Sequence, residues 1–234
     1  MNGTLFGVGV GPGDPELITL KALRCIKAAD VIAYPKLEDT ASFARSIISD
    51  LVADSQEEFP ITIPMLTDPK PAQKVYDKAA SAIAECLNDG KIVAALCEGD
   101  PFFYGSFQFL FSRLAGSYRV EIVPGVSSLM SCAASISMPL SARNDILTIL
   151  PAPLCDDNLR ERLSGTDATA IIKIGRHFDR VYALLKSLEL DQFAHYIERS
   201  TLPTERILPL DRVEGDKVPY FSMILVHKRG EAWR

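Results

Sequence analysis

The chain has 234 residues, of which 47% are hydrophobic, 8% aromatic and 24% charged, and its formal net charge is −5 at pH 7. This composition is typical of a globular protein with one large core or two modest ones. Because the net charge is negative and no block of five or six Lys or Arg occurs, a nucleic-acid partner is not expected.

Membrane and metal partners are not expected either. No apolar run is long enough to cross a bilayer, and a strand-like segment follows the first three residues directly, so we expect a cytoplasmic protein. The five cysteines are widely spaced, which is typical of thiols in a reducing compartment. The three histidines lack the paired spacing of a metal site.

The N-terminal part alternates strand-like and helix-like segments, which predicts an α/β fold with a mainly parallel sheet covered by helices. Asp14 and Pro15 are suited to begin the first helix. The proline-rich residues 60–71 are expected to be a surface excursion. The expected strands are 5–10, 31–34, 92–97 and 120–123, and the helices include 42–51, one ending at 87, 107–114 and 126–136.

The sequence pattern changes after Pro139, and a Pro-Ala-Pro break follows at 151–153. We therefore expect an N-terminal α/β domain over 1–142, which holds the glycine-rich loops, and a C-terminal α/β domain over 143–234. In the second domain the expected strands are 146–150, 170–174, 193–197, 206–208 and 221–226, and the helices are 157–163 and 176–188.

The first glycine-rich loop, residues 7–15, follows a strand and precedes a helix. A dinucleotide-binding fingerprint would need glycine where Pro12 or Asp14 stands, and the Asp14 carboxylate would repel a pyrophosphate. A nucleotide loop is therefore disfavoured, whereas a merely structural turn stays open.

Two later loops repeat this strand-to-helix placement. In residues 98–106, Asp100 offers a carboxylate beside three aromatic side chains, which suits a cationic, adenine-bearing ligand; the alternative is a β-turn with aromatic residues in the core. In residues 123–128, Ser127 and Ser128 either cap a helix or contact a ligand. Open parallel sheets bind ligands at the carboxyl ends of their strands, so three such loops favour a binding site.

These motifs resemble the tetrapyrrole methylase family over essentially the whole chain. They are Gly-x-Gly-Pro-Gly-Asp-Pro-Glu-Leu from Gly9, Gly-Asp-Pro-x-x-x-Gly from Gly99, and Pro-Gly-Val-Ser-Ser from Pro124. The resemblance implies methyl transfer from S-adenosyl-L-methionine and a two-domain fold with a smaller mixed α/β C-terminal domain. It also implies a cofactor cleft between the domains and a homodimer.

Within the family, the variants at 33–36, 98–106, 173–176, 196–199 and 220–223 are most similar to enzymes that methylate carbon 20 of precorrin-2 in cobalamin biosynthesis. Sirohaem-forming members carry Tyr-Asp where this chain has Tyr34 and Pro35, so that proton acceptor does not carry over and no catalytic residue is assigned. A metal-free or cobalt-containing substrate, another precorrin methylase, diphthine synthase, an NAD-binding enzyme and a non-catalytic binding module stay open.

The resemblance also implies site residues. Asp100 would hold a polar end of the cofactor, and Phe103 and Ile174 would flank its adenosine. Plain strand packing is the alternative for Ile174 and Ser222, and a solvated surface role is the alternative for each cation. The cofactor candidates are Pro12, Glu98, Gly99, Asp100, Phe103, Ser127, Ser128, Ile174, Ser200 and Ser222; the tetrapyrrole candidates are Tyr34, Lys36, Tyr104 and Arg143, with Lys173, Arg176 and Arg199 as further cations.

Overall fold

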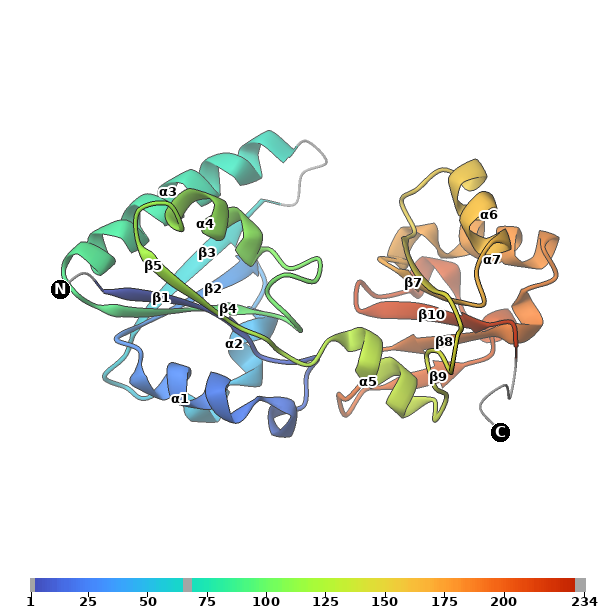
Figure 1. The fold of residues 1–234 in the computed structure, drawn as a ribbon, viewed down its shortest axis with the longest axis horizontal. Coiled ribbons are helices and arrows are strands. Elements are labelled where there is room, and N and C mark those ends of the chain that lie inside the picture. Colours follow the sequence, from blue (N-terminus) through green and yellow to red (C-terminus); the bar gives the residue numbers. More distant parts are fainter. Residues whose placement is uncertain (1–2, 65–68, 230–234) are drawn as a thin grey trace. The chain divides into compact units, whose positions relative to one another are not determined.

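The computed structural model of the chain describes residues 3–64 and 69–229 (Figure 1). It divides into two compact units, residues 1–127 and 128–234, each with its own five-stranded sheet.

The N-terminal unit is built on a fully parallel sheet in the order β3-β2-β4-β1-β5. A parallel sheet of this kind is the α/β architecture that the sequence predicts. The strands are β1 (Thr4–Gly9), β2 (Val31–Leu37), β3 (Glu57–Ile63), β4 (Ile92–Cys97) and β5 (Arg119–Val123), and the helices are α1 (Leu20–Ala28), α2 (Phe43–Ile47), α3 (Pro69–Asn88) and α4 (Phe107–Leu114).

Both faces of this sheet are covered, as Figure 1 shows, with α3 and α4 on one side and α1 and α2 on the other. Strand β4 illustrates why. Its apolar side chains alternate between the two cores, because Val93 and Ala95 pack with α3 and α4 while Ala94 and Leu96 pack with α1 and α2. A strand buried on both faces is a continuous apolar run, which is why its predicted bounds agree with the structure.

The expected surface excursion at 60–71 is wrong at both ends, because its first residues belong to β3 and α3 already begins at Pro69. Residues Glu57–Ile63 form β3, which pairs in parallel with β2. An edge strand tolerates Pro60 because only one of its sides must hydrogen-bond to a neighbouring strand. Residues 65–68 lie outside the described part of the chain.

Two expected helices also differ from the structure. Asp14 accepts a hydrogen bond from the backbone N–H of Glu16, but it caps only a short 3-10 turn, and α1 begins later, behind the Thr19 cap. The expected helix at 42–51 is split into α2 and the 3-10 turn Ser49–Leu51.

The C-terminal unit has a mixed sheet in the order β6-β7-β10-β8-β9, with α6 and α7 packed on a core that includes Leu159, Phe178 and Ile224. The expected helix at 176–188 begins instead with a 3-10 turn, Gly175–His177. The elements are α5 (Ser128–Ser135), β6 (Leu147–Pro151), α6 (Asp156–Ser164), β7 (Ala168–Ile172), α7 (Phe178–Ser187), β8 (Ala194–Glu198), β9 (Arg206–Leu208) and β10 (Ser222–His227).

Helix α5 belongs to the C-terminal unit. The hydroxyl of Ser135 donates to the carboxylate of Glu205 over 2.7 Å, and that of Ser200 donates to Ser131 over 3.0 Å. The units therefore divide between residues 127 and 128, whereas the sequence pattern places the boundary between 142 and 143. The change in sequence pattern after Pro139 comes at the end of a segment, including α5, that already packs with the second sheet.

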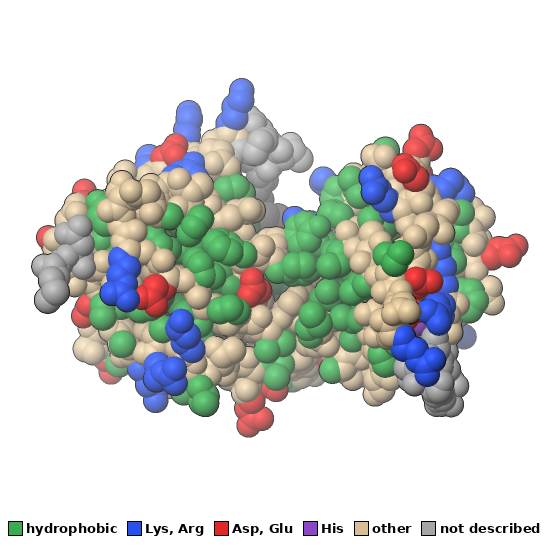
Figure 2. All heavy atoms as spheres, viewed as in Figure 1, with side chains coloured by type: hydrophobic (Ala, Val, Ile, Leu, Met, Phe, Trp, Pro, Cys, Tyr) green, Lys and Arg blue, Asp and Glu red, His purple; other side chains and the backbone are tan. Residues whose placement is uncertain are grey.

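The described surface and helices bear on the expected partners. None of the helices within the described ranges is long and apolar enough to cross a membrane. On the face drawn in Figure 2, Lys and Arg side chains stand in separate groups with Asp and Glu among them. Within 3–64 and 69–229, no group of three or more His, Cys, Asp or Glu side chains is arranged to hold a metal ion.

Candidate functional site

Three loops meet at the carboxyl edge of the N-terminal sheet. They follow β1, β4 and β5, which are neighbours in the sheet. The first two loops are joined directly: Gly11 donates its N–H to the carbonyl of Gly99 over 3.3 Å, and Gly99 donates to the carbonyl of Gly11 over 2.8 Å. The structure thus brings together the three motifs that the sequence singles out.

The glycines of these loops are in backbone contact. A Cβ atom on Gly125 would lie 2.0 Å from the carbonyl oxygen of Gly99 and 2.8 Å from the Cα of Gly9. A Cβ on Gly9 would lie 2.6 Å from the same carbonyl oxygen. Side chains at these positions would push the loops apart, so glycine is required here by the packing of one loop on another.

Asp100 ties the second loop to the third. Its Oδ1 accepts a hydrogen bond from the backbone N–H of Phe102 over 2.9 Å, and its Oδ2 accepts one from Gly125 over 3.1 Å. Each carboxylate oxygen can accept a further hydrogen bond. The structure therefore gives Asp100 a role in holding the loops, and its expected contact with the cofactor stays a prediction.

Glu98 follows β4 at the same edge and is half-buried. Burial raises the pKa of its carboxyl group, although hydrogen bonds with the backbone of Glu98 itself and of Ala44 lower it in part. No Lys, Arg or His of the described residues forms an ion pair with it. Desolvation of a carboxylate without a counter-ion is unfavourable, and a cationic ligand would reduce that cost.

The aromatic residues of the second loop have different surroundings. Phe102 is half exposed and makes an edge contact with Phe111 of α4 at 5.0 Å between ring centroids, while Phe103 and Tyr104 contact each other at 5.2 Å. Phe102 therefore packs on a helix of its own unit, which agrees in part with the alternative of aromatic packing. Phe103 and Tyr104 follow Asp100 by three and four residues in the same loop and stay candidates.

Several candidates have left-handed backbone, which is uncommon for residues other than glycine and is found often at functional sites. Among the described residues, Tyr104, Arg143, Lys173 and Arg199 have φ angles of 55°, 52°, 58° and 52°. Arg143 is exposed in the segment before β6 and belongs to the C-terminal unit.

Ile174, Ser200 and Ser222 come together at one edge of the C-terminal sheet. Ile174 and Ser200 follow the ends of β7 and β8, and β10, which starts at Ser222, runs antiparallel to both strands. The side chain of Ile174 is fully buried in the core of its unit, which favours the packing alternative. The hydroxyl of Ser222 donates to the carbonyl of Pro219 over 2.7 Å.

The remaining cofactor candidates lie near the first and third loops. Pro12 is buried beside Gly11, and Ser127 and Ser128 stand on the two sides of the division between the units.

The hydroxyl of Tyr34 is hydrogen-bonded to a neighbouring side chain. Its hydroxyl donates to Glu58 over 2.8 Å, and burial together with this bond raises its pKa to about 12. The carboxylate of Glu58 also accepts hydrogen bonds from Nε and Nη2 of Arg45, over 3.0 and 2.8 Å. The sequence does not reveal Arg45 and Glu58 as site candidates, because they lie far from the glycine motifs and meet only through the pairing of β2 with β3.

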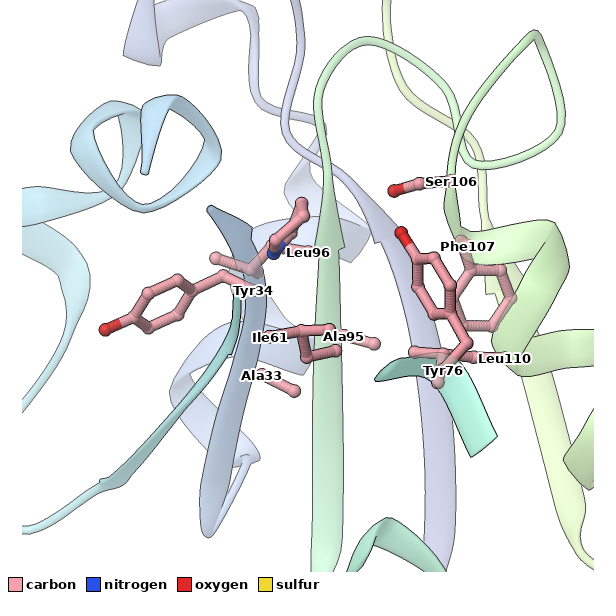
Figure 3. A pocket seen from close by; sticks show the side chains of 10 residues that line it. Ala33, Tyr34, Ile61, Tyr76, Ala95, Leu96, Ser106, Phe107 and Leu110 are labelled. Carbon is pink, nitrogen blue, oxygen red and sulfur yellow. The ribbon is translucent and has the colours of Figure 1, made fainter. Parts of the chain in front are cut away.

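A small cavity of about 10 Å³ lies beside the end of β2, lined by residues that include Tyr34, Tyr76 and Ser106. Figure 3 shows the hydroxyl of Tyr76 directed toward Ser106, whereas the ring of Tyr34 points away from both. The hydroxyl of Tyr76 is buried without a hydrogen bond of ordinary geometry to any described group, although the nearby Ser106 partly offsets the rise of its pKa on burial. Tyr76 is a third polar residue, after Arg45 and Glu58, that the sequence motifs miss.

Comparison with known proteins identifies related chains. The family model described as Tetrapyrrole (Corrin/Porphyrin) Methylases matches residues 4–214. The precorrin-2 C(20)-methyltransferase of Sinorhizobium sp. is 38% identical over 233 residues, which cover 96% of this chain and 95% of the relative. The cobalt-precorrin-2 C(20)-methyltransferase of Salmonella typhimurium is 32% identical over 234 residues, which cover 99% of each.

A solved structure of a cobalt precorrin-4 methyltransferase is similar with a TM-score of 0.72 at 21% identity, covering 96% of this chain and 94% of the other. At this identity the likeness supports the fold, and it confirms the two-sheet α/β architecture.

Proposed function

Because this chain belongs to the tetrapyrrole methylase family, we propose that it transfers a methyl group from S-adenosyl-L-methionine to carbon 20 of precorrin-2, giving precorrin-3A in cobalamin biosynthesis. The observation that carries the proposal is the similarity to a precorrin-2 and a cobalt-precorrin-2 C(20)-methyltransferase over nearly the full length of the chains. The joining of the three glycine loops at one sheet edge supports it, since such an edge is where open parallel sheets bind ligands.

The half-buried Glu98 carboxylate, which has no ion pair with a described residue, fits a cationic cofactor. S-adenosyl-L-methionine, when bound, supplies a methyl group on a positively charged sulfur. In our proposal both units contribute residues to the cofactor site. The cofactor is held there by Pro12, Glu98, Gly99, Asp100, Phe103 and Ser127 of the first unit and by Ser128, Ile174, Ser200 and Ser222 of the second. Ile174 and Ser222 contribute mainly through their backbone, because their side chains are buried.

The work of the protein in such a reaction is to align the reacting carbon with the methyl group and to exclude water. Lys36 and Arg143 are proposed to bind carboxylates of the tetrapyrrole, and Tyr104 to contact the macrocycle. Tyr34, whose pKa is raised to about 12, stays protonated near neutral pH and is not proposed as the proton acceptor.

Cobalt-precorrin-2 is the second candidate substrate, because the Salmonella relative is named for it. The two substrates differ in the metal at the centre of the macrocycle, and the candidate residues bind its periphery. The expected homodimer stays a prediction that light scattering of the purified protein would test.

Incubation of the purified protein with methyl-labelled S-adenosyl-L-methionine and either precorrin-2 or cobalt-precorrin-2 tests the proposal. The expected product carries the label at carbon 20. Label at any other carbon, or no transfer to either substrate, would contradict the proposed function. The Gly116→Ala variant is a suitable control preparation, because a Cβ there meets no atom within 4 Å.

A further inference from the structure

A groove lies at the end of β2, apart from the three glycine loops. Its volume is about 300 Å³, and its lining includes Tyr34, Lys36 and Arg45 together with the hydroxyl side chains of Thr40, Ser42 and Ser46. It lies at the carboxyl end of β2, because its lining includes Lys36 of that strand and residues 40–42, which follow the strand. The groove therefore opens at the same edge of the sheet as the proposed cofactor site.

The charged groups of the groove leave one positive charge. Arg45 and Glu58 form a two-bonded ion pair, and the hydrogen bonds from Arg45 and Tyr34 lower the pKa of Glu58, so this pair is neutral overall at pH 7. Lys36 forms no ion pair with a described residue. Its ammonium is thus an uncompensated cation in a concave site.

The hydrogen-bond donors favour an anion. The hydroxyls of Thr40, Ser42 and Ser46 donate to backbone carbonyls at 3.2, 2.6 and 2.7 Å, so they shape the walls and keep no proton for a ligand. Arg45 uses Nε and Nη2 for Glu58, and its Nη1 makes no hydrogen bond to a described group. The side-chain donors left for a ligand include the ammonium of Lys36, the N–H groups of Arg45 Nη1 and the second N–H of its Nη2.

We propose that this groove binds one carboxylate arm of the tetrapyrrole, with Lys36 and Arg45 in contact with the carboxylate and Glu58 and Tyr34 as positioning residues. A volume of about 300 Å³ suits a side arm and lies at the low end for sites that enclose a whole ligand. A guanidinium held by a bidentate partner presents its remaining N–H groups in a fixed direction, which favours a planar carboxylate. The inference rests on the proposed function, since that reaction supplies a substrate rimmed by carboxylates.

Steady-state kinetics with precorrin-2, or with cobalt-precorrin-2 if that is the form accepted, tests the groove. Lys36→Met and Arg45→Met are each expected to raise KM for the tetrapyrrole roughly tenfold or more, because a charge-assisted hydrogen bond is lost. The affinity for S-adenosylhomocysteine should stay within about twofold. The matched control is Lys91→Met, which removes a cation at the amino end of β4 in the same unit and should leave KM unchanged.

The Glu58→Gln variant distinguishes a role of Glu58 in positioning Arg45 from a general electrostatic attraction between the groove and an anion. The substitution makes the groove more positive, so a simple attraction of anions predicts a lower KM. A positioning role predicts a higher KM, because Arg45 loses its bidentate partner. A lower or unchanged KM in this variant would overturn the positioning role, and unchanged KM in both cation variants would overturn the subsite. If the wild-type protein methylates neither tetrapyrrole, the proposed function fails and this inference falls with it.

Discussion

Replacing Gly125 by alanine tests the contact between the glycine loops. The new Cβ would lie 2.0 Å from the carbonyl oxygen of Gly99, and restoring an ordinary contact of 3.4 Å requires the loops to separate by about 1.4 Å. Both neighbours are backbone atoms at a sheet edge, so no flexible side chain can give way. Overpacking of this kind costs about 1–3 kcal/mol, and we expect a loss of about 3 kcal/mol at this site.

For a chain of this size, such a loss lowers the melting temperature by roughly 6–12 °C. Thermal unfolding followed by circular dichroism measures the shift, and calorimetric titration with S-adenosylhomocysteine measures whether the displaced loops still bind it. Gly116→Ala is the matched control, expected to unfold at the wild-type temperature or slightly above it. A Gly125→Ala protein that melts within about 2 °C of wild type and binds S-adenosylhomocysteine normally would refute the reasoning.

Three further substitutions address single groups. Asp100→Asn keeps one acceptor oxygen for two backbone N–H donors, so we expect a loss of about 1–3 kcal/mol in urea unfolding, and a wild-type midpoint would contradict this. Tyr76→Phe removes a buried hydroxyl that has no hydrogen bond of ordinary geometry to a described group, so the same measurement should show a change below about 1 kcal/mol, whereas a loss above about 2 kcal/mol would reveal a partner. Because the folded state raises the pKa of Glu98 above its ordinary 4.5, the stability it contributes is present below that value and is lost as the pH rises through the folded pKa. Glu98→Gln should therefore be less sensitive than wild type to a change from pH 5 to pH 8 in urea unfolding, and equal pH dependence in both proteins would show that this carboxyl is not perturbed.

The sequence predicts strands well where burial is complete and poorly where it is partial. Strand β4 is apolar at every position because both of its faces are covered, and its predicted and observed bounds agree. Strand β3 begins with two exposed glutamates and contains Pro60, so nothing local separates it from a loop. Its existence depends on pairing with β2, which is a tertiary contact.

The candidate site shows the same contrast. The glycine loops are visible in the sequence because each needs glycine at a fixed distance from a strand. That Gly9, Gly99 and Gly125 touch one another depends on the strand order, which brings residues more than a hundred positions apart into contact. Arg45 and Glu58 carry no motif at all, since their meeting depends on α2 packing against β2 and on β3 pairing with the same strand.

The tight contact between the loops explains why the motifs indicate a family more readily than a substrate. Gly9 and Gly125 are constrained by the backbone of neighbouring loops, and Asp100 accepts hydrogen bonds from that backbone, so these residues are fixed by the shape of the sheet edge whatever tetrapyrrole is bound. Side chains outside the glycine contacts are free of that constraint. Lys36 lines a groove without forming an ion pair with a described residue, and it can therefore differ between enzymes that share the same loops. The residues that distinguish one tetrapyrrole from another should accordingly lie at positions such as Lys36 and Arg45. A substitution there changes the contacts with the periphery of the substrate and leaves the packing of the loops intact.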